Sequence, residues 1–381
     1  MKILILSPLY YPDRFGGIEK VVYEFTRRMV EKKIKVYVIC GTQNVEGNLI
    51  QEGVKLHRIS TVGAFNEGSF EKYYEANNKA IDIIKKIEPD IIWVHDWFFA
   101  LAALNYIETK NIPLISQAHL LKRFESKNRI SSWRSFVDLM QTILFKSSEV
   151  ILAASPSQIR SIHQYYRIPK NKIQQIQFGL DSYDFKKEKK SLVNKMPTFI
   201  YIGRFEIEKN IITFLESLEI YENELTTSIC LRLMGTGSLI EQLNNWKSRT
   251  SKVNIEIIPF SDNFKIVQKM ISESDALILP SLYDSYGLAA LEAFSMGVPV
   301  ILSKQCGISE DLHCYPKNMI FDGYNKREMY EAVQYCLQNL GNLPTIGLNA
   351  RKSFISTHNW DLSLEQILER INLIKKEEVN A

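Results

Sequence analysis

The sequence is poor in the features that mark secreted, membrane-spanning and nucleic-acid-binding proteins. Its five cysteines are odd in number and scattered, which indicates free thiols and not a disulfide framework. No window approaches the run of about 18 apolar residues that a membrane-spanning helix needs, and the N-terminal apolar run stops at Pro8, too early for a secretory signal. A net charge of +4 is too small to predict nucleic-acid binding by itself. We therefore expect a cytoplasmic protein without a nucleic-acid partner.

Sequence signals for metals and dinucleotides are also missing. Cys306, His313 and Cys314 lie close together, but neither a fourth ligand nor a paired C-x-x-C accompanies them. No D-x-D carboxylate pair is placed to hold a metal ion. The first apolar run leads to Gly16-Gly17 and not to G-x-G-x-x-G, which argues against a dinucleotide at that turn. We expect neither a metal nor a cofactor.

What the chain does contain is an alternation of strand and helix patterns. Short continuous apolar runs fit buried parallel strands, and the segments between them place apolar residues on one helical face. In the first half the predicted strands are 2–7, 35–40, 90–95, 112–119 and 149–155, and the predicted helices are 17–32, 70–87 and 98–109. This order is typical of a doubly wound α/β sheet.

A polar, basic stretch at 183–197 interrupts the alternation and ends at a proline, as an interdomain linker does. The pattern then restarts, with predicted strands at 198–203, 228–235, 253–260, 275–280 and 299–303, and predicted helices at 209–220, 237–247, 263–272, 287–296 and, amphipathic, 361–376. We predict two Rossmann-like domains, 1–182 and 198–355, that face each other across a cleft. We expect a C-terminal helix within 356–381 to pack back on the first domain.

Turns that follow the predicted strands carry the chemistry. Arg204 offers a planar fork of donors and Lys209 a point charge, a pair suited to a diphosphate. In PSLYDSYGLAALEAFSMGVPV (280–300), Gly287 lies where a helix begins, so the amides of 287–289 favour an anion. Asp284 and Glu292 could accept from sugar and ribose hydroxyls. Taken singly, each of these turns also fits a plain strand-to-helix connection or solvated surface cations.

Nine segments, in this order, resemble the retaining glycosyltransferases of family 4, which have the GT-B fold: FGGIEK, VHDW, PLISQAH, ILAASPS, QFGLD, YIGRFEIEKN, LMGTG, the 280–300 stretch and NWDLSLEQIL. The resemblance implies transfer of a hexose-type sugar from a nucleoside-diphosphate sugar to an acceptor hydroxyl, with retention at the anomeric carbon. UDP is the favoured carrier, with GDP and ADP as alternatives. The implied acceptor is a glycan, a lipid-linked sugar or another hydroxyl compound, in cell-surface polysaccharide or glycolipid synthesis.

The resemblance also implies site residues. Arg204 and Lys209 would hold the donor diphosphate, Glu292 the ribose and Asp284 the transferred sugar. His119 would lie beside that sugar, and His95 with Asp96 on the acceptor side. The implied catalytic set is Asp284, His119, Arg204 and Lys209; the donor-binding set is Gly16, Gly17, Gly203, Arg204, Lys209, Gly235, Asp284, Tyr286, Gly287, Leu288, Ala289 and Glu292. On the bare residues, His119 also fits a buried histidine at a strand end.

Asp284 departs from the family pattern, which normally has glutamate at this position. Aspartate is shorter by one carbon–carbon bond, roughly 1.5 Å, enough to break a hydrogen bond. The sequence leaves open whether the loop shifts, the sugar differs or the activity is low. It also leaves open a non-catalytic relative that binds a partner, and a nicotinamide-dependent oxidoreductase on similar sheets.

Segment 120–146 interleaves basic and aromatic residues on an amphipathic pattern. Such a segment suits an anionic membrane surface, which would place the protein peripherally at the inner face of the plasma membrane. A mobile loop followed by a core-facing helix with a solvated basic side is the alternative.

Overall fold

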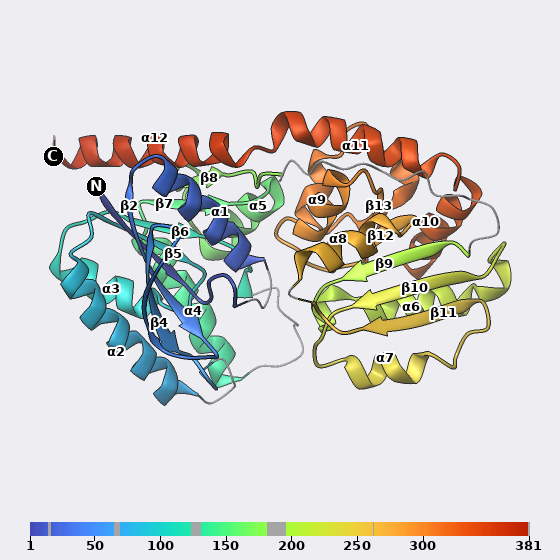
Figure 1. The fold of residues 1–381 in the computed structure, drawn as a ribbon, viewed down its shortest axis with the longest axis horizontal. Coiled ribbons are helices and arrows are strands. Elements are labelled where there is room, and N and C mark those ends of the chain that lie inside the picture. Colours follow the sequence, from blue (N-terminus) through green and yellow to red (C-terminus); the bar gives the residue numbers. More distant parts are fainter. Residues whose placement is uncertain (14–16, 65–68, 123–130, 181–195, 262, 380–381) are drawn as a thin grey trace. The chain divides into compact units, whose positions relative to one another are not determined.

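The computed structural model of the 381-residue chain describes residues 1–13, 17–64, 69–122, 131–180, 196–261 and 263–379. It divides into two compact units (Figure 1). Unit 1 comprises Met1–Gly179 and Trp360–Ala381, and unit 2 comprises Leu180–Asn359. Residues 183–195 of the predicted linker lie outside the described residues.

Unit 1 is built on an eight-stranded sheet in the order β3-β4-β2-β1-β5-β6-β7-β8. Its neighbouring strands run parallel except β3, which pairs antiparallel with β4. Strands β5, β6 and β7 are buried at every residue, as expected for parallel strands covered on both faces. The strands are β1 (Lys2–Ser7), β2 (Lys35–Thr42), β3 (Gly47–Gln51), β4 (Val54–Ser60), β5 (Ile91–His95), β6 (Leu114–Gln117), β7 (Val150–Ala153) and β8 (Ile173–Gln175).

Helices cover both faces of this sheet. Ile92 and Val94 belong to a core cluster with residues of α2, α3 and α4. Trp93 alternates to the other face, where Phe25 of α1 packs between Trp93 and Trp360 of α12, with ring centroids 5.4 and 5.2 Å away. The helices of unit 1 are α1 (Ile18–Glu31), α2 (Phe70–Ile87), α3 (Ala100–Thr109), α4 (Ser132–Ser147), α5 (Pro156–Tyr166) and α12 (Trp360–Val379).

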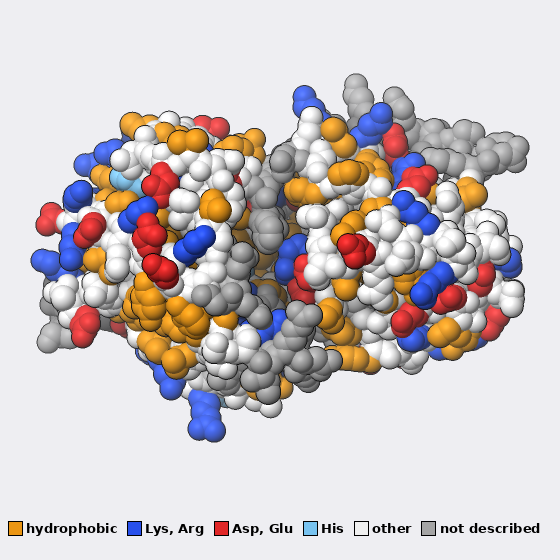
Figure 2. All heavy atoms as spheres, turned by 90° about the horizontal axis from the view of Figure 1, so that it is seen from below, with side chains coloured by type: hydrophobic (Ala, Val, Ile, Leu, Met, Phe, Trp, Pro, Cys, Tyr) orange, Lys and Arg blue, Asp and Glu red, His pale blue; other side chains and the backbone are white. Residues whose placement is uncertain are grey.

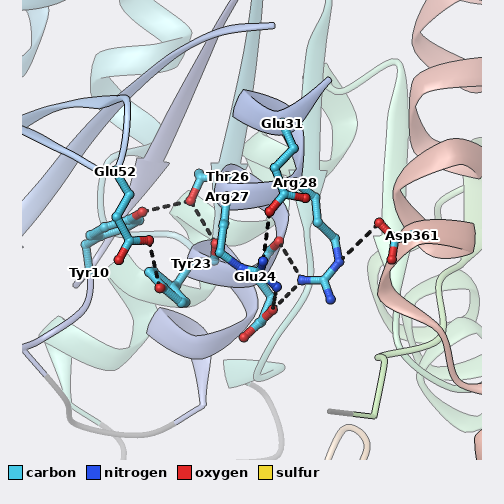
Figure 3. A network of polar contacts seen from close by, with 9 residues as sticks. All are labelled: Tyr10, Tyr23, Glu24, Thr26, Arg27, Arg28, Glu31, Glu52 and Asp361. Atoms are coloured by element: carbon cyan, nitrogen blue, oxygen red, sulfur yellow. Dashed lines mark hydrogen bonds and ion pairs between the residues drawn. The ribbon is translucent and has the colours of Figure 1, made fainter. Parts of the chain in front are cut away.

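A polar network on α1 extends to α12 (Figure 3). Arg28 pairs with Glu24 on its own helix, and its Nε lies 3.4 Å from Asp361 Oδ1. One turn further on, Lys32 Nζ lies 3.1 Å from Glu365 Oε1. The last helix of the chain is therefore held to the first by both ring packing and ion pairs.

Unit 2 has a six-stranded parallel sheet in the order β11-β10-β9-β12-β13-β14. The strands are β9 (Thr198–Ile202), β10 (Ile229–Met234), β11 (Val253–Ile258), β12 (Ala276–Leu279), β13 (Val300–Ser303) and β14 (Ile320–Phe321). Its helices are α6 (Ile211–Ile220), α7 (Ile240–Trp246), α8 (Phe264–Ser272), α9 (Leu288–Ser295), α10 (Lys326–Gln338) and α11 (Leu343–Thr357).

The two predicted Rossmann-like sheets are confirmed, and every predicted strand or helix range overlaps an element of that type. The sequence analysis missed the strands β3, β4, β8 and β14 and the helices α5, α10 and α11. In the part of the chain that the structure describes, no helix has the length and apolar character needed to cross a membrane.

Candidate functional site

Two glycine turns meet at the carboxyl ends of β9 and β10. A Cβ atom on Gly235 would lie 1.9 Å from the carbonyl oxygen of Gly203, so residue 235 has room only for a hydrogen. Gly203 N donates to Met234 O over 3.1 Å and holds the two turns together. Gly235 is thus required by a close backbone approach, whereas a Cβ atom on Gly203 would meet the Tyr201 side-chain hydroxyl at 2.9 Å.

Arg204 follows this turn and is held by a neighbouring carboxylate. Its Nη2 lies 2.8 Å from Glu208 Oε1, with side-chain exposures of 31% for Arg204 and 9% for Glu208. The Tyr201 hydroxyl donates to Arg204 O over 2.6 Å. The guanidinium is therefore fixed at one end and still in contact with solvent.

Lys209 and Asp284 form an ion pair between the turns after β9 and β12. Lys209 Nζ lies 2.8 Å from Asp284 Oδ2, and the two side chains are only 15% and 18% exposed. The sequence analysis had assigned them separately, the lysine to a diphosphate and the aspartate to a sugar. The structure brings them into direct contact.

Asn210 is a residue of this region that the sequence analysis missed. It has a left-handed backbone, with φ of 59°, which asparagine tolerates better than most residues. Its buried side-chain amide donates to Pro280 O over 3.2 Å and to Gly323 O over 2.8 Å. Asn210 thereby ties the Lys209 turn to the start of the Asp284 loop. An asparagine at the beginning of the predicted helix 209–220 was the signal available in the sequence.

Gly287 opens α9 from a left-handed conformation, with φ of 105°. The first helical residues, Leu288 and Ala289, are half-buried, and Glu292 lies half-buried in the second turn. In the loop before the helix, Tyr286 N donates to Asp284 Oδ1 over 3.2 Å. The predicted arrangement of an acid before a helix start and another within the helix is present.

Tyr286 directs its side chain into unit 2. The residue is 1% exposed, and its hydroxyl donates to Asp311 Oδ2 over 3.1 Å and contacts His358 Nε2. Burial raises the pKa of this hydroxyl well above its usual value. The side chain therefore anchors the loop, while the main chain of Tyr286 lies beside Asp284.

In unit 1, His95 and His119 form a buried hydrogen-bonded pair. His95 Nδ1 lies 2.9 Å from His119 Nε2, and the residues are 0% and 8% exposed. Burial lowers the pKa of His119 to about 3 and that of His95 well below its usual value, so both rings are neutral near pH 7. These two predicted residues are brought together.

Asp96 and the glycines near α1 complete the predicted set. Asp96 is 6% exposed, and its Oδ1 accepts from Trp97 N over 3.0 Å and from Gln141 Nε2 over 3.4 Å. Gly17 is the N-cap of α1, whereas Gly16 lies outside the described residues. The predicted residues thus form one group in unit 1 and one in unit 2, each at the carboxyl edge of a sheet, where ligands bind in doubly wound folds.

Two family models match consecutive parts of the chain. The model described as Glycosyltransferase Family 4 matches residues 15–182, and the model described as Glycosyl transferases group 1 matches residues 182–353. This protein is a family 4 glycosyltransferase. Family membership decides in favour of the glycosyltransferase over the oxidoreductase and the non-catalytic relative that the sequence left open.

The glycosyltransferase is similar to several curated proteins. It is 20% identical over 381 residues to an uncharacterized glycosyltransferase of Methanocaldococcus jannaschii, covering 95% of each chain. It is 24% identical over 335 residues to a glycogen synthase of Mycobacterium tuberculosis, covering 81% of this chain and 80% of the other. It is 22% identical over 329 residues to the UDP-Gal:alpha-D-GlcNAc-diphosphoundecaprenol alpha-1,3-galactosyltransferase of Escherichia coli, with the same coverage.

Solved structures show that the glycosyltransferase has the GT-B fold. Sucrose-phosphate synthase from Thermosynechococcus elongatus aligns over 100% of both chains, with a TM-score of 0.81 and 16% identity. The catalytic domain of starch synthase IV from Arabidopsis thaliana, bound to ADP and acarbose, aligns over 97% of this chain and 98% of its own, with a TM-score of 0.75 and 15% identity. An Anabaena protein in complex with UDP and glucose aligns over 98% of this chain and 99% of its own, with a TM-score of 0.75 and 16% identity.

Proposed function

We propose that the protein is a retaining hexosyltransferase that transfers a sugar from a nucleoside-diphosphate donor, with UDP favoured, to an acceptor hydroxyl. The observation that carries the proposal is the ion pair between Lys209, in the turn after β9, and Asp284, in the loop that leads from β12 into α9. Lys209 Nζ lies 2.8 Å from Asp284 Oδ2. A diphosphate needs cations and amide donors, and a sugar needs carboxylate acceptors. UDP is supported by the similar proteins whose names include it, while the ADP-bound relative keeps ADP in the test.

In the proposed reaction, the bond between the anomeric carbon and the diphosphate oxygen breaks as the bond to the acceptor oxygen forms. The acceptor's proton passes to a donor phosphate oxygen, and nucleoside diphosphate leaves. Arg204, Lys209 and the first amides of α9 stabilise the charge that develops on the leaving group, which is an electrostatic role. Lysine has three N–H donors, so Lys209 can maintain its ion pair with Asp284 and contact a phosphate oxygen at the same time.

The other predicted residues take the following roles in this proposal. Glu292 accepts hydrogen bonds from the ribose, Asp284 accepts them from the transferred sugar, and His119 contacts that sugar. Asp96 acts on the acceptor side through its neighbours, since it is nearly buried.

We further propose that the acceptor is lipid-linked and that unit 1 contacts an anionic membrane surface. Residues 123–130 of the predicted membrane segment lie outside the described residues, but α4 continues the segment. Leu139 and Ile143 of α4 are 54% and 38% exposed. A groove of about 380 Å³ in the same unit is lined by Leu101, Leu104, Asn105, Ile107 and Glu108 of α3 and by Ser147 at the end of α4. Figure 2 shows hydrophobic side chains gathered on the part of the molecule that carries α2 and α4.

Vesicle co-sedimentation tests the membrane proposal. The wild type is expected to bind vesicles that contain anionic lipid at low salt, and Leu139→Glu is expected to lose most of this binding. Ile355→Glu introduces the same charge at a 50% exposed position of unit 2 and should leave binding unchanged. Absence of binding by the wild type would contradict the membrane contact, but not the sugar transfer.

Calorimetric titration tests the donor site. UDP, GDP and ADP, and their hexose forms, are titrated into the wild type, Arg204→Ala and Arg232→Ala. Arg232 is a control in the same unit, because it pairs with Glu256 over 3.1 Å on the neighbouring strand and has no proposed role. One nucleotide should bind, with affinity lost in Arg204→Ala and kept in Arg232→Ala. Failure of every nucleotide to bind the folded protein would overturn the proposal, and an inverted anomeric carbon in the product would overturn retention.

A further inference from the structure

His95 and His119 lie on the same face of the unit 1 sheet. His95 ends β5 and is in register with Gln117 of β6, and His119 follows two residues later, so its side chain returns to that face. The two rings are tilted by 27° with centroids 5.2 Å apart. Trp93 packs on His95 with centroids 4.7 Å apart, and Phe178 stacks on His119 at 6.5 Å. Both imidazoles are therefore held in fixed positions.

The hydrogen bond between the two rings determines their tautomers. A neutral imidazole carries one N–H and one bare nitrogen, so a single proton lies between His95 Nδ1 and His119 Nε2. If His119 donates, the proton of His95 must lie on Nε2. If His95 donates, the proton of His119 must lie on Nδ1.

The surroundings of His95 favour the second arrangement. His95 Nε2 is buried, and no atom of the described residues forms a hydrogen bond with it. In protein main chains, buried N–H groups without an acceptor are rarer than under-satisfied acceptors, and by the same reasoning a bare nitrogen is favoured over an N–H at this position. Since Nε2 of His95 is best left bare, His95 donates from Nδ1, and His119 carries its remaining proton on Nδ1.

We infer that His95 is a positioning residue that holds His119 as the Nδ1–H tautomer, so that His119 offers an N–H donor to a hydroxyl oxygen of the bound sugar. His95 has no exposed surface, so it acts through His119 and not on the substrate. The Gln158 side chain supports the arrangement, because its Nε2 donates to the main-chain oxygen of His119 over 3.3 Å. This inference rests on the contact between His119 and the donor sugar under the proposed function.

Nitrogen-15 NMR of histidine-labelled protein tests the tautomer without any substrate. The ring signals of His95 and His119 are assigned with His95→Asn and His119→Asn. We expect both rings to be neutral at pH 7 and both to carry hydrogen on Nδ1. A signal from His119 with hydrogen on Nε2 would overturn the inference, whatever the activity of the enzyme.

Kinetics test the consequence with two matched variants. His95→Leu removes the donor, and we expect it to lower kcat by about tenfold with nucleoside-diphosphate affinity unchanged. His95→Asn keeps an N–H donor near the position of Nδ1 and should restore kcat to within about twofold of the wild type. Equal losses in both variants at equal thermal stability would contradict the positioning role.

A third variant separates this inference from the proposed function. His119→Asn keeps a donor near Nδ1 that no longer depends on His95, so adding His95→Leu to it should cause little further loss. A full additional tenfold loss would overturn the coupling. If replacing His119 by leucine leaves turnover unchanged, the contact with the sugar fails, and the NMR result alone then decides the tautomer.

Discussion

Lys209 Nζ lies 2.8 Å from Asp284 Oδ2, and both side chains are mostly shielded from solvent. One is the cation proposed to hold the diphosphate, and the other is the carboxylate proposed to hold the transferred sugar. Their pairing fixes the position of each before the donor arrives. It also offsets the repulsion between Asp284 and the diphosphate, because Lys209 lies against the carboxylate.

Asp284→Asn should therefore separate sugar transfer from nucleotide binding. Loss of a charged hydrogen bond costs about 1.5–3 kcal/mol, so we expect kcat/KM to fall about 10–100-fold. Affinity for free UDP, which lacks the sugar, should stay the same or rise, because Lys209 is released from its partner. Steady-state kinetics and UDP titration of the same preparation check this. A parallel loss of UDP affinity would contradict the assignment of Asp284 to the sugar, and Asp284→Glu is the control that keeps the charge.

Gly235→Ala should destabilise unit 2. The new Cβ would lie 1.9 Å from Gly203 O, so one of the two turns must move, and we expect a loss of about 2–4 kcal/mol in the free energy of unfolding. Gly341→Ala is the matched control, since no atom lies within 4 Å of its Cβ position, and it should change stability by less than about 0.5 kcal/mol. Urea unfolding measures both. Equal midpoints for the two variants would show that the turns relax freely.

The buried histidines should make the protein less stable in mild acid. The pKa of His119 is about 3 in the folded protein and about 6.5 when unfolded, so the unfolded state binds more protons between these values. The contribution of His119 to the free energy of unfolding is fully present above pH 6.5 and is lost as pH falls toward 3. Between pH 6.5 and 5 this loss is about 2 kcal/mol. Unfolding free energies at pH 5–7.5 check the slope, which His119→Asn should reduce.

Trp360→Ala should destabilise unit 1 although residue 360 lies far along the chain. The indole is 1% exposed and packs edge-on against Phe25, with ring centroids 5.2 Å apart. We therefore expect the free energy of unfolding to fall by about 3–5 kcal/mol. Leu362→Ala on the same helix removes a side chain that is 52% exposed and should have an effect within about 0.5 kcal/mol. Hydrogen exchange of α1 would show whether the loss reaches the helix against which Trp360 packs. Undiminished protection there would contradict the proposed coupling.

The sequence predicted the buried strands well because their signal is local. Strands such as β1 and β5 are continuous apolar runs, and α1 has a clear amphipathic face. Strand β3 was missed because four of its five residues are exposed, so it has no apolar pattern. The short β8 and β14 have three and two residues, too few for any periodicity.

The motifs located the site residues but not their mutual contacts. Lys209 and Asp284 are 75 residues apart, and His95 and His119 are 24 apart, so neither pair has a local signature. Gly235 was assigned to the donor-binding set, whereas the atom that a Cβ on residue 235 would meet first is the main-chain oxygen of Gly203. Such close approaches follow from tertiary packing and leave no other trace in the sequence.

The attachment of α12 to α1 also sets the order in which the two units can be completed during synthesis on the ribosome. Arg28 emerges early, but its partner Asp361 is made 361 − 28 = 333 residues later, which takes roughly 17–67 s at about 5–20 residues per second. Throughout that interval Phe25 lacks its Trp360 neighbour. Unit 2, whose ends are joined by a 3.0 Å hydrogen bond from Leu180 N to His358 O, is complete before the N-terminal unit. The part of the nascent chain that is made first is thus the part that is finished last.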